Sequence, residues 1–124
     1  MNIKPAASET SRPETFLPLR PVEYHVLLSL SHRERHGYGI MLDAEERTGT
    51  AFQIGTFYRA LARMKQAGLI EDAEGRPDDD DDERRNYYRI TGLGRAVAAA
   101  ESERMAALLR EARAGGLLGQ RGGR

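Results

Sequence analysis

A chain of 124 residues is long enough for one domain with a modest core and too short for two. Its hydrophobic share of 40% beside 31% charged residues is typical of a soluble or dimeric protein, and no apolar run approaches the roughly 20 residues of a membrane-spanning helix. The absence of cysteine excludes disulfides and thiol chemistry, and the lack of a signal-peptide pattern leads us to expect a cytoplasmic location.

The formal net charge of +0 hides a strong segregation of charge along the chain. Glu71, Asp72, Glu74 and the run Asp78–Glu83 are acidic, and Arg76 is the only basic residue among them. The rest of the chain is therefore basic. Overall neutrality does not exclude a nucleic-acid partner.

The first part of the chain is predicted to be a tail followed by two helices. Residues 1–20 mix proline with serine and threonine without a period, which indicates a flexible tail. A helix is expected over residues 21–31, with proline in its first turn. Residues 32–37 break the apolar pattern and are predicted to form a turn, and a second helix is expected over 38–48, ended by Gly49.

A third helix is predicted to start at Gln53 and to end at Gly68, and its two faces differ in chemistry. No acidic residue occurs in it. The face expected to pack in the core consists of Ile54, Phe57, Leu61 and Met64. The opposite face carries Thr56, Arg59, Arg63 and Gln66. This face has the cations and hydrogen-bond donors of a DNA-recognition helix, and a solvated helix face would have the same pattern.

A β-hairpin with an acidic loop is predicted directly after this helix. Its strands are expected over residues 69–73 and 84–91, joined by residues 74–83. Three helices followed by such a hairpin make a winged helix-turn-helix, which we place over residues 21–91.

A long C-terminal helix is predicted over residues 92–114, with Thr91 as its N-cap and a flexible tail over 115–124. At 1.5 Å per residue it is roughly 35 Å long, more than a three-helix core needs. Its apolar stripe must be covered, most simply by a second copy of the chain, so we expect a homodimer. The stripe consists of Leu93, Val97, Ala100, Met105, Leu108, Leu109 and Ala112.

With these elements in place, the sequence resembles the PadR family of transcriptional regulators, in its smaller subfamily with one C-terminal dimerisation helix. The resemblance implies a mainly α fold with a small β-hairpin, no cofactor, and a homodimer that binds a palindromic operator in double-stranded DNA. It further implies a repressor that is released by a small-molecule effector or a stress signal. The segments that carry the resemblance are His36–Ile40, Gly55–Leu61, Gly68–Ile70 and Tyr87–Gly94.

The resemblance also assigns DNA-facing residues and shows where this chain departs from its family. It places Tyr38, Thr56, Tyr58, Arg59 and Arg63 toward DNA. Arg59 adds a charge where the family often has proline. Gln53 replaces a small capping residue, which we expect to weaken the helix start while supplying a base-reading side chain. The wing tip carries five aspartates where the family is neutral or basic, so we expect it to point away from DNA or to limit nonspecific binding.

Two kinds of DNA contact are expected from these residue types. Arg59 and Arg63 lie four residues apart, and arginine can bond both acceptors of guanine in the major groove. Lys65, Arg84 and Arg85 are expected to contact phosphates, which gives affinity without sequence information. For Tyr38 and Tyr58 the sequence leaves two alternatives, a hydrogen bond to phosphate or packing at the rim of the core.

Metal binding and catalysis are not expected. His32 and His36 have a helical metal-binding spacing, yet they fall in a predicted turn without a third ligand. The aspartates of residues 78–82 lack the glycine and glutamate of a calcium loop. His25 is interpreted as a structural histidine, and no nucleophile motif is present.

The leading interpretation is therefore a dimeric DNA-binding regulator that is not an enzyme. The alternative is a winged-helix protein-interaction module without DNA binding, which would use its acidic wing to engage a basic partner.

Overall fold

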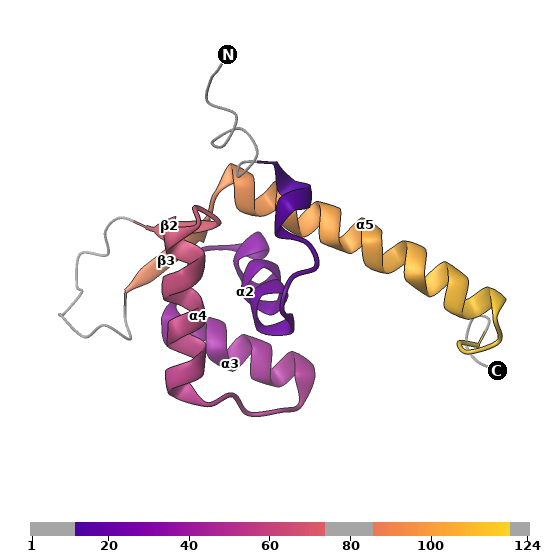
Figure 1. The fold of residues 1–124 in the computed structure, drawn as a ribbon. Coiled ribbons are helices and arrows are strands. Elements are labelled where there is room, and N and C mark those ends of the chain that lie inside the picture. The colour runs from indigo at the N-terminus through magenta and orange to yellow at the C-terminus, as the bar shows by residue number, and fades with distance from the viewer. Residues whose placement is uncertain (1–11, 74–85, 120–124) are drawn as a thin grey trace, which may run out of the picture.

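A computed structural model of the chain describes residues 12–73 and 86–119. The segments between Arg12 and Asp72 and between Tyr87 and Ala114 fold into helices and short strands (Figure 1). In chain order the elements are η1 (Pro13–Phe16), α2 (Pro21–His32), β1 (Arg35–His36), α3 (Gly37–Thr48), α4 (Ile54–Gln66), β2 (Ile70–Asp72), β3 (Tyr87–Ile90) and α5 (Gly92–Ala114). The predicted mainly α winged helix-turn-helix is confirmed.

The small antiparallel sheet has the strand order β1-β3-β2. Strands β2 and β3 form the predicted hairpin, with Ile70 opposite Ile90 and Asp72 opposite Tyr88. The prediction of a turn over residues 32–37 is wrong for Arg35 and His36, which pair with Tyr88 and Tyr87 as strand β1. A two-residue strand is too short to show an alternating pattern, so only the available edge of β3 makes it a strand.

The core lies between α2, α3, α4 and the first half of α5. Its central side chains are at most 4% exposed, and they are Val26, Leu27, Leu30, Ile40, Met41, Phe57, Leu61, Met64, Leu69, Ile70 and Val97. Phe57, Leu61 and Met64 confirm the predicted inner face of α4. The expected burial of Ile54 is wrong, because Ile54 is the first residue of α4, three residues before the first buried one, and is 57% exposed.

The segment before α2 packs on the fold, which differs from the expectation of a flexible tail over residues 1–20. The 3-10 helix η1 lies beside the first half of α5 (Figure 1). Leu17 and Leu19 pack against the core, and the backbone N–H of Leu19 donates to Oε2 of Glu101 at 3.1 Å. Prolines among these apolar residues remove any helical or strand period, so the sequence hides the packing. Residues 1–11 lie outside the described part of the chain.

Helix α5 starts in close contact with the end of α4. Thr91 caps it as predicted, with its Oγ1 accepting from the N–H of Gly94 at 2.9 Å. A Cβ at position 94 would lie 2.1 Å from the carbonyl oxygen of Leu69, so only glycine allows α5 to approach the backbone just before β2 this closely. None of the described helices combines the length and the apolar character that crossing a membrane requires.

The predicted dimerisation stripe divides into two parts. Leu93 packs against the core and Val97 is fully buried in it, so Val97 cannot contact a second chain. Beyond Glu101 the helix projects away from the rest of the molecule (Figure 1), and Leu108 and Leu109 are 55% and 52% exposed. Ala100, Met105 and Ala112 are half-buried.

Glu101 is a buried carboxylate that ties the N-terminal segment to α5. Its side chain is 3% exposed and accepts from Nε and Nη2 of Arg104 at 2.6 and 3.0 Å, in addition to the N–H of Leu19. The hydrogen bond from Arg104 lowers the pKa of Glu101, although burial acts in the opposite direction.

We therefore predict that Glu101→Gln destabilises the fold by about 1–3 kcal/mol at neutral pH, because it removes a charge-assisted hydrogen bond. The pKa of Glu101 is lower in the folded chain than its ordinary value of 4.5. Its contribution is thus complete above that value and is lost as the pH falls through the folded pKa. Urea unfolding at pH 7 and at acidic pH measures this. Wild type and Glu101→Gln should converge in acid, and Glu103→Gln, an exposed glutamate on the same helix, should match wild type throughout. A stability gap that stays constant with pH would contradict the assignment.

Candidate nucleic-acid interface

The outer face of α4 begins with a side-chain cap supplied by Gln53. Its Oε1 accepts from the backbone N–H of Thr56 at 3.2 Å and from the Thr56 hydroxyl at 2.6 Å. Gln53 therefore satisfies a free N–H at the helix start, as a smaller capping residue would. Gln53 is expected to weaken the helix start, yet its longer side chain folds back onto the first turn and supplies a cap.

The same hydrogen-bond chain continues to Arg59. Nη2 of Arg59 donates to Oγ1 of Thr56 at 3.3 Å, and all three residues are exposed. The sequence predicted these residues for one site, and the structure brings them together. Because Oε1 of Gln53 is used in the cap, Gln53 and Arg59 present N–H donors to solvent. This arrangement suits acceptor atoms such as N7 and O6 of guanine, and it does not suit the paired donor and acceptor contact that glutamine makes with adenine.

Arg63 lies on the same exposed face and is held by an acidic residue of another helix. Its Nη2 lies 3.4 Å from Oε2 of Glu23 in α2. The other oxygen of Glu23 accepts from the backbone N–H of Arg20 at 3.0 Å, so this carboxylate also caps α2. This partner could not be predicted from the sequence, because Glu23 is 40 residues away in the chain.

Lys65 points toward the wing, where it pairs with Asp72. Its Nζ lies 2.8 Å from Oδ2 of Asp72, and this hydrogen bond raises the pKa of Lys65. A phosphate would therefore compete with Asp72 for this ammonium. Arg84 and Arg85, together with the acidic residues 78–82, lie outside the described part of the chain.

The two tyrosines expected near DNA have different environments. Tyr38 is 43% exposed at the start of α3. Tyr58 is half-buried, with its ring edge-to-face against Phe57 at a centroid distance of 5.8 Å. A Cβ at Gly37 would lie 2.9 Å from its Cε1, so the ring packs tightly on the start of α3. Tyr58 fits the alternative of packing at the rim of the core, whereas Tyr38 is open to solvent.

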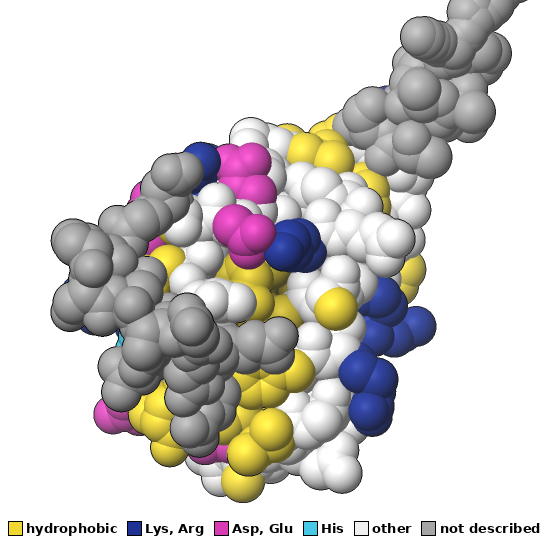
Figure 2. Space-filling view, turned by 90° about the vertical axis from the view of Figure 1, so that its left-hand side faces the viewer, with side chains coloured by type: hydrophobic (Ala, Val, Ile, Leu, Met, Phe, Trp, Pro, Cys, Tyr) yellow, Lys and Arg dark blue, Asp and Glu magenta, His cyan; other side chains and the backbone are white. Residues whose placement is uncertain are grey.

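The face formed by α4 and the wing is uneven in charge and polarity (Figure 2). Lys and Arg side chains lie along one of its sides, acidic side chains lie close to one of them, and apolar side chains gather in its lower part. Ile54 of α4 is one of the exposed large apolar residues of the described chain. The basic, acidic and apolar side chains of this face are thus separated from one another in large part.

Two of the histidines, His25 and His36, have structural partners. Nδ1 of His36 accepts from the N–H of Gly39 at 2.9 Å and caps α3, while its ring lies edge-to-face against Tyr87. Nδ1 of His25 accepts from Nε of Arg47 at 3.1 Å, and burial, followed by the charge of Arg47, lowers the pKa of His25. Within residues 12–73 and 86–119 no three His, Asp or Glu side chains are grouped as metal ligands.

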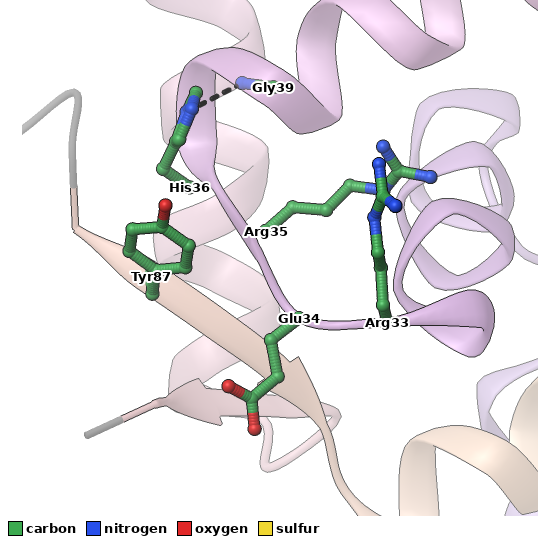
Figure 3. A pocket seen from close by; sticks show the side chains of 6 residues that line it. All are labelled: Arg33, Glu34, Arg35, His36, Gly39 and Tyr87. Atoms are coloured by element: carbon green, nitrogen blue, oxygen red, sulfur yellow. Dashed lines mark hydrogen bonds between the residues drawn. The ribbon is translucent and has the colours of Figure 1, made fainter. Parts of the chain in front are cut away.

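A hollow of about 390 Å³ lies beside β1 and the start of α3 (Figure 3). It was not predicted from the sequence. Nε of Arg35 is bonded to the carbonyl oxygen of Ser29, and its guanidinium lies 3.7 Å from Asp43. The exposed charges that remain, those of Arg33 and Glu34, have opposite sign and favour no ligand of one charge. The residues that line it are Arg33, Glu34, Arg35, His36, Gly39 and Tyr87.

Comparison with known proteins gives the same assignment as the fold. A structure of a transcriptional regulator from Clostridium thermocellum has a TM-score of 0.60 at 26% identity, over 72% of this chain and 86% of that chain. A PadR family transcription regulator from Clostridium difficile has a TM-score of 0.64 at 23% identity, over 73% and 93% of the two chains.

Among curated proteins, an uncharacterized protein of Lysinibacillus sphaericus is 37% identical over 73 residues, and the match spans 65% of that protein. The model of the transcriptional regulator PadR-like family matches residues 26–100, from α2 into α5. The chain therefore belongs to the PadR-like family of transcriptional regulators.

Proposed function

We propose that this chain is a sequence-specific DNA-binding regulator whose helix α4 enters the major groove. The observation that carries the proposal is the exposed series of side-chain hydrogen bonds that joins Gln53, Thr56 and Arg59. It lies at the start of a 13-residue helix without any acidic residue. The helix is roughly 20 Å long, and its diameter of about 10–12 Å with side chains fits a B-DNA major groove that is about 12 Å wide. Such a regulator acts in the cytoplasm, and we assign it no catalytic role.

Base reading is assigned to Arg59, with Gln53, Thr56 and Arg63 beside it. Arg59 is bonded to the uncharged Thr56, so no carboxylate has to be displaced before it contacts guanine. Tyr38 is in a position to give one hydrogen bond to phosphate, and Lys65 would exchange Asp72 for phosphate. These phosphate contacts make the affinity depend on salt concentration.

The dimer is assigned to the projecting half of α5. Leu108 and Leu109 are more than half exposed, and the half-buried Met105 and Ala112 continue the stripe along the helix. Dimeric helix-turn-helix proteins bind half-sites about 34 Å apart, and a two-fold symmetric dimer of this chain would therefore require a palindromic operator. A dimer bound across a promoter would act as a repressor.

We further propose that a small molecule or a stress signal releases the dimer from its operator. An effector that binds one dimer arrangement more tightly than another changes the population of the arrangement that fits the operator. The hydrogen bonds of Thr91 to Gly68 and Leu69 support such coupling, because they join the end of α4 to the start of α5.

The first prediction from the proposed function concerns the two arginines on the exposed face of α4. Arg59→Ala combined with Arg63→Ala should lower the affinity for a selected operator at least about tenfold, since each arginine–guanine pair contributes about 1–3 kcal/mol. Gel shifts over a salt series measure the loss. A matched control, Arg12→Ala with Arg110→Ala, removes the same charge from exposed positions outside α4 and should keep the affinity. Equal affinities of the two double variants would contradict the assignment.

The second prediction concerns the ion pair of Arg63. Glu23→Gln keeps an amide oxygen for the N–H of Arg20 and removes the negative charge beside Arg63. Operator affinity should rise about two- to fivefold, the range of an exposed ion pair. The increase should disappear when Arg63→Ala is also present, because the two residues act together. An equal increase in both backgrounds would show that Glu23 acts by general charge repulsion.

The third prediction concerns the dimer. Leu108→Lys with Leu109→Lys should yield a monomer by sedimentation or light scattering while α5 stays helical by circular dichroism. Leu117→Lys changes a side chain that is 84% exposed beyond α5 and should leave the dimer intact. A dimer that survives both leucine changes would require another interface.

A further inference from the structure

Ile54 is an apolar side chain in an unusual position. It is the first residue of α4, it directly follows the cap Gln53, and it is 57% exposed. The large apolar residues of α4 that lie in the core are at most 1% exposed; they are Phe57, Leu61 and Met64. Single exposed apolar residues are common on proteins, so exposure alone says little. A role for Ile54 is indicated by the residues around it.

These surroundings are those of a DNA-reading surface. Ile54 directly follows Gln53, which begins the hydrogen-bonded series Gln53–Thr56–Arg59 at the N-terminal end of α4, and α4 contains three cations and no acidic residue. An anionic partner is therefore favoured over a second protein surface at this place. In helix-turn-helix proteins the N-terminal residues of the recognition helix are the ones that reach the base edges.

We infer that Ile54 is a specificity-determining residue that contacts the C5-methyl group of a thymine in the major groove. This inference rests on the proposed DNA-binding function. Thymine is the base that presents a methyl group in that groove, and an isoleucine side chain has no donor or acceptor for any other base-edge group. Contact removes both apolar surfaces from water and so favours thymine over cytosine at one position of each half-site.

The contact complements what the polar neighbours do. Gln53 and Arg59 present donors and favour acceptor atoms, which several bases share in part. Ile54 adds a distinction that no hydrogen bond makes, between a base with a methyl group and one without it. A half-site with guanine near Arg59 and thymine near Ile54 follows from the two together.

The test uses the full-length protein and a duplex selected from random double-stranded DNA by rounds of binding. Each thymine of the selected half-site is replaced in turn by deoxyuridine, which lacks the methyl group and keeps the hydrogen-bonding atoms. Affinities of wild type, Ile54→Val, Ile54→Ala and the control Leu117→Ala are measured on every duplex. Thermal unfolding checks that all variants fold, which is expected because both side chains are exposed.

For wild type, one thymine per half-site should be sensitive, and its replacement should lower affinity about fourfold, the value of one methyl group removed from water. Ile54→Val should keep this sensitivity, whereas Ile54→Ala should bind the thymine and deoxyuridine duplexes with affinities within about twofold of each other. Leu117→Ala should behave as wild type.

Two results overturn the inference alone: DNA binding that is insensitive to every deoxyuridine, or a sensitivity that Ile54→Ala retains. Failure to select any duplex would overturn the proposed function, and the assignment of Ile54 would fall with it.

Discussion

The burial of the inner face of α4 is the constraint on which the rest of the structure depends. Phe57, Leu61 and Met64 are at most 1% exposed, and removing side chains of this size from water contributes about 1.5–3 kcal/mol each. This packing fixes the rotation of α4 about its own axis. Because the rotation is fixed, Gln53, Thr56 and Arg59 stay on the outside, where their mutual hydrogen bonds can form.

A second constraint joins the end of α4 to the start of α5. The α4 helix ends at Gln66 and is followed by Gly68, whose φ of +83° suits glycine. The hydroxyl of Thr91 donates to the carbonyl oxygens of Gly68 and Leu69. Gly94 allows α5 to touch the same backbone. The recognition helix, the hairpin and the first turn of α5 therefore form one unit. In a dimer, any rotation of α5 would carry α4 with it.

The cations of α4 also depend on their acidic neighbours. Lys65 is paired with Asp72 and Arg63 with Glu23, whereas Arg59 bonds to the uncharged Thr56. Of the cations of α4, Arg59 is thus the one that would contact an anion without first leaving a carboxylate. The paired cations would instead exchange one anion for another, which weakens their contribution to affinity.

The sequence by itself determined the helices, the hairpin and the two-faced character of α4, because local periodicity and capping residues such as Thr91 and Gly49 encode them. It also brought together Thr56 and Arg59, which lie one turn apart on the same helix. The tertiary structure alone decided the partners that are distant in the chain. It paired Glu23 with Arg63 and Glu101 with Leu19, made a strand of Arg35 and His36, and buried Val97 in its own core. Exposure of Ile54 was decided in the same way, because periodicity gives the direction of a side chain while the neighbouring elements determine whether anything covers it.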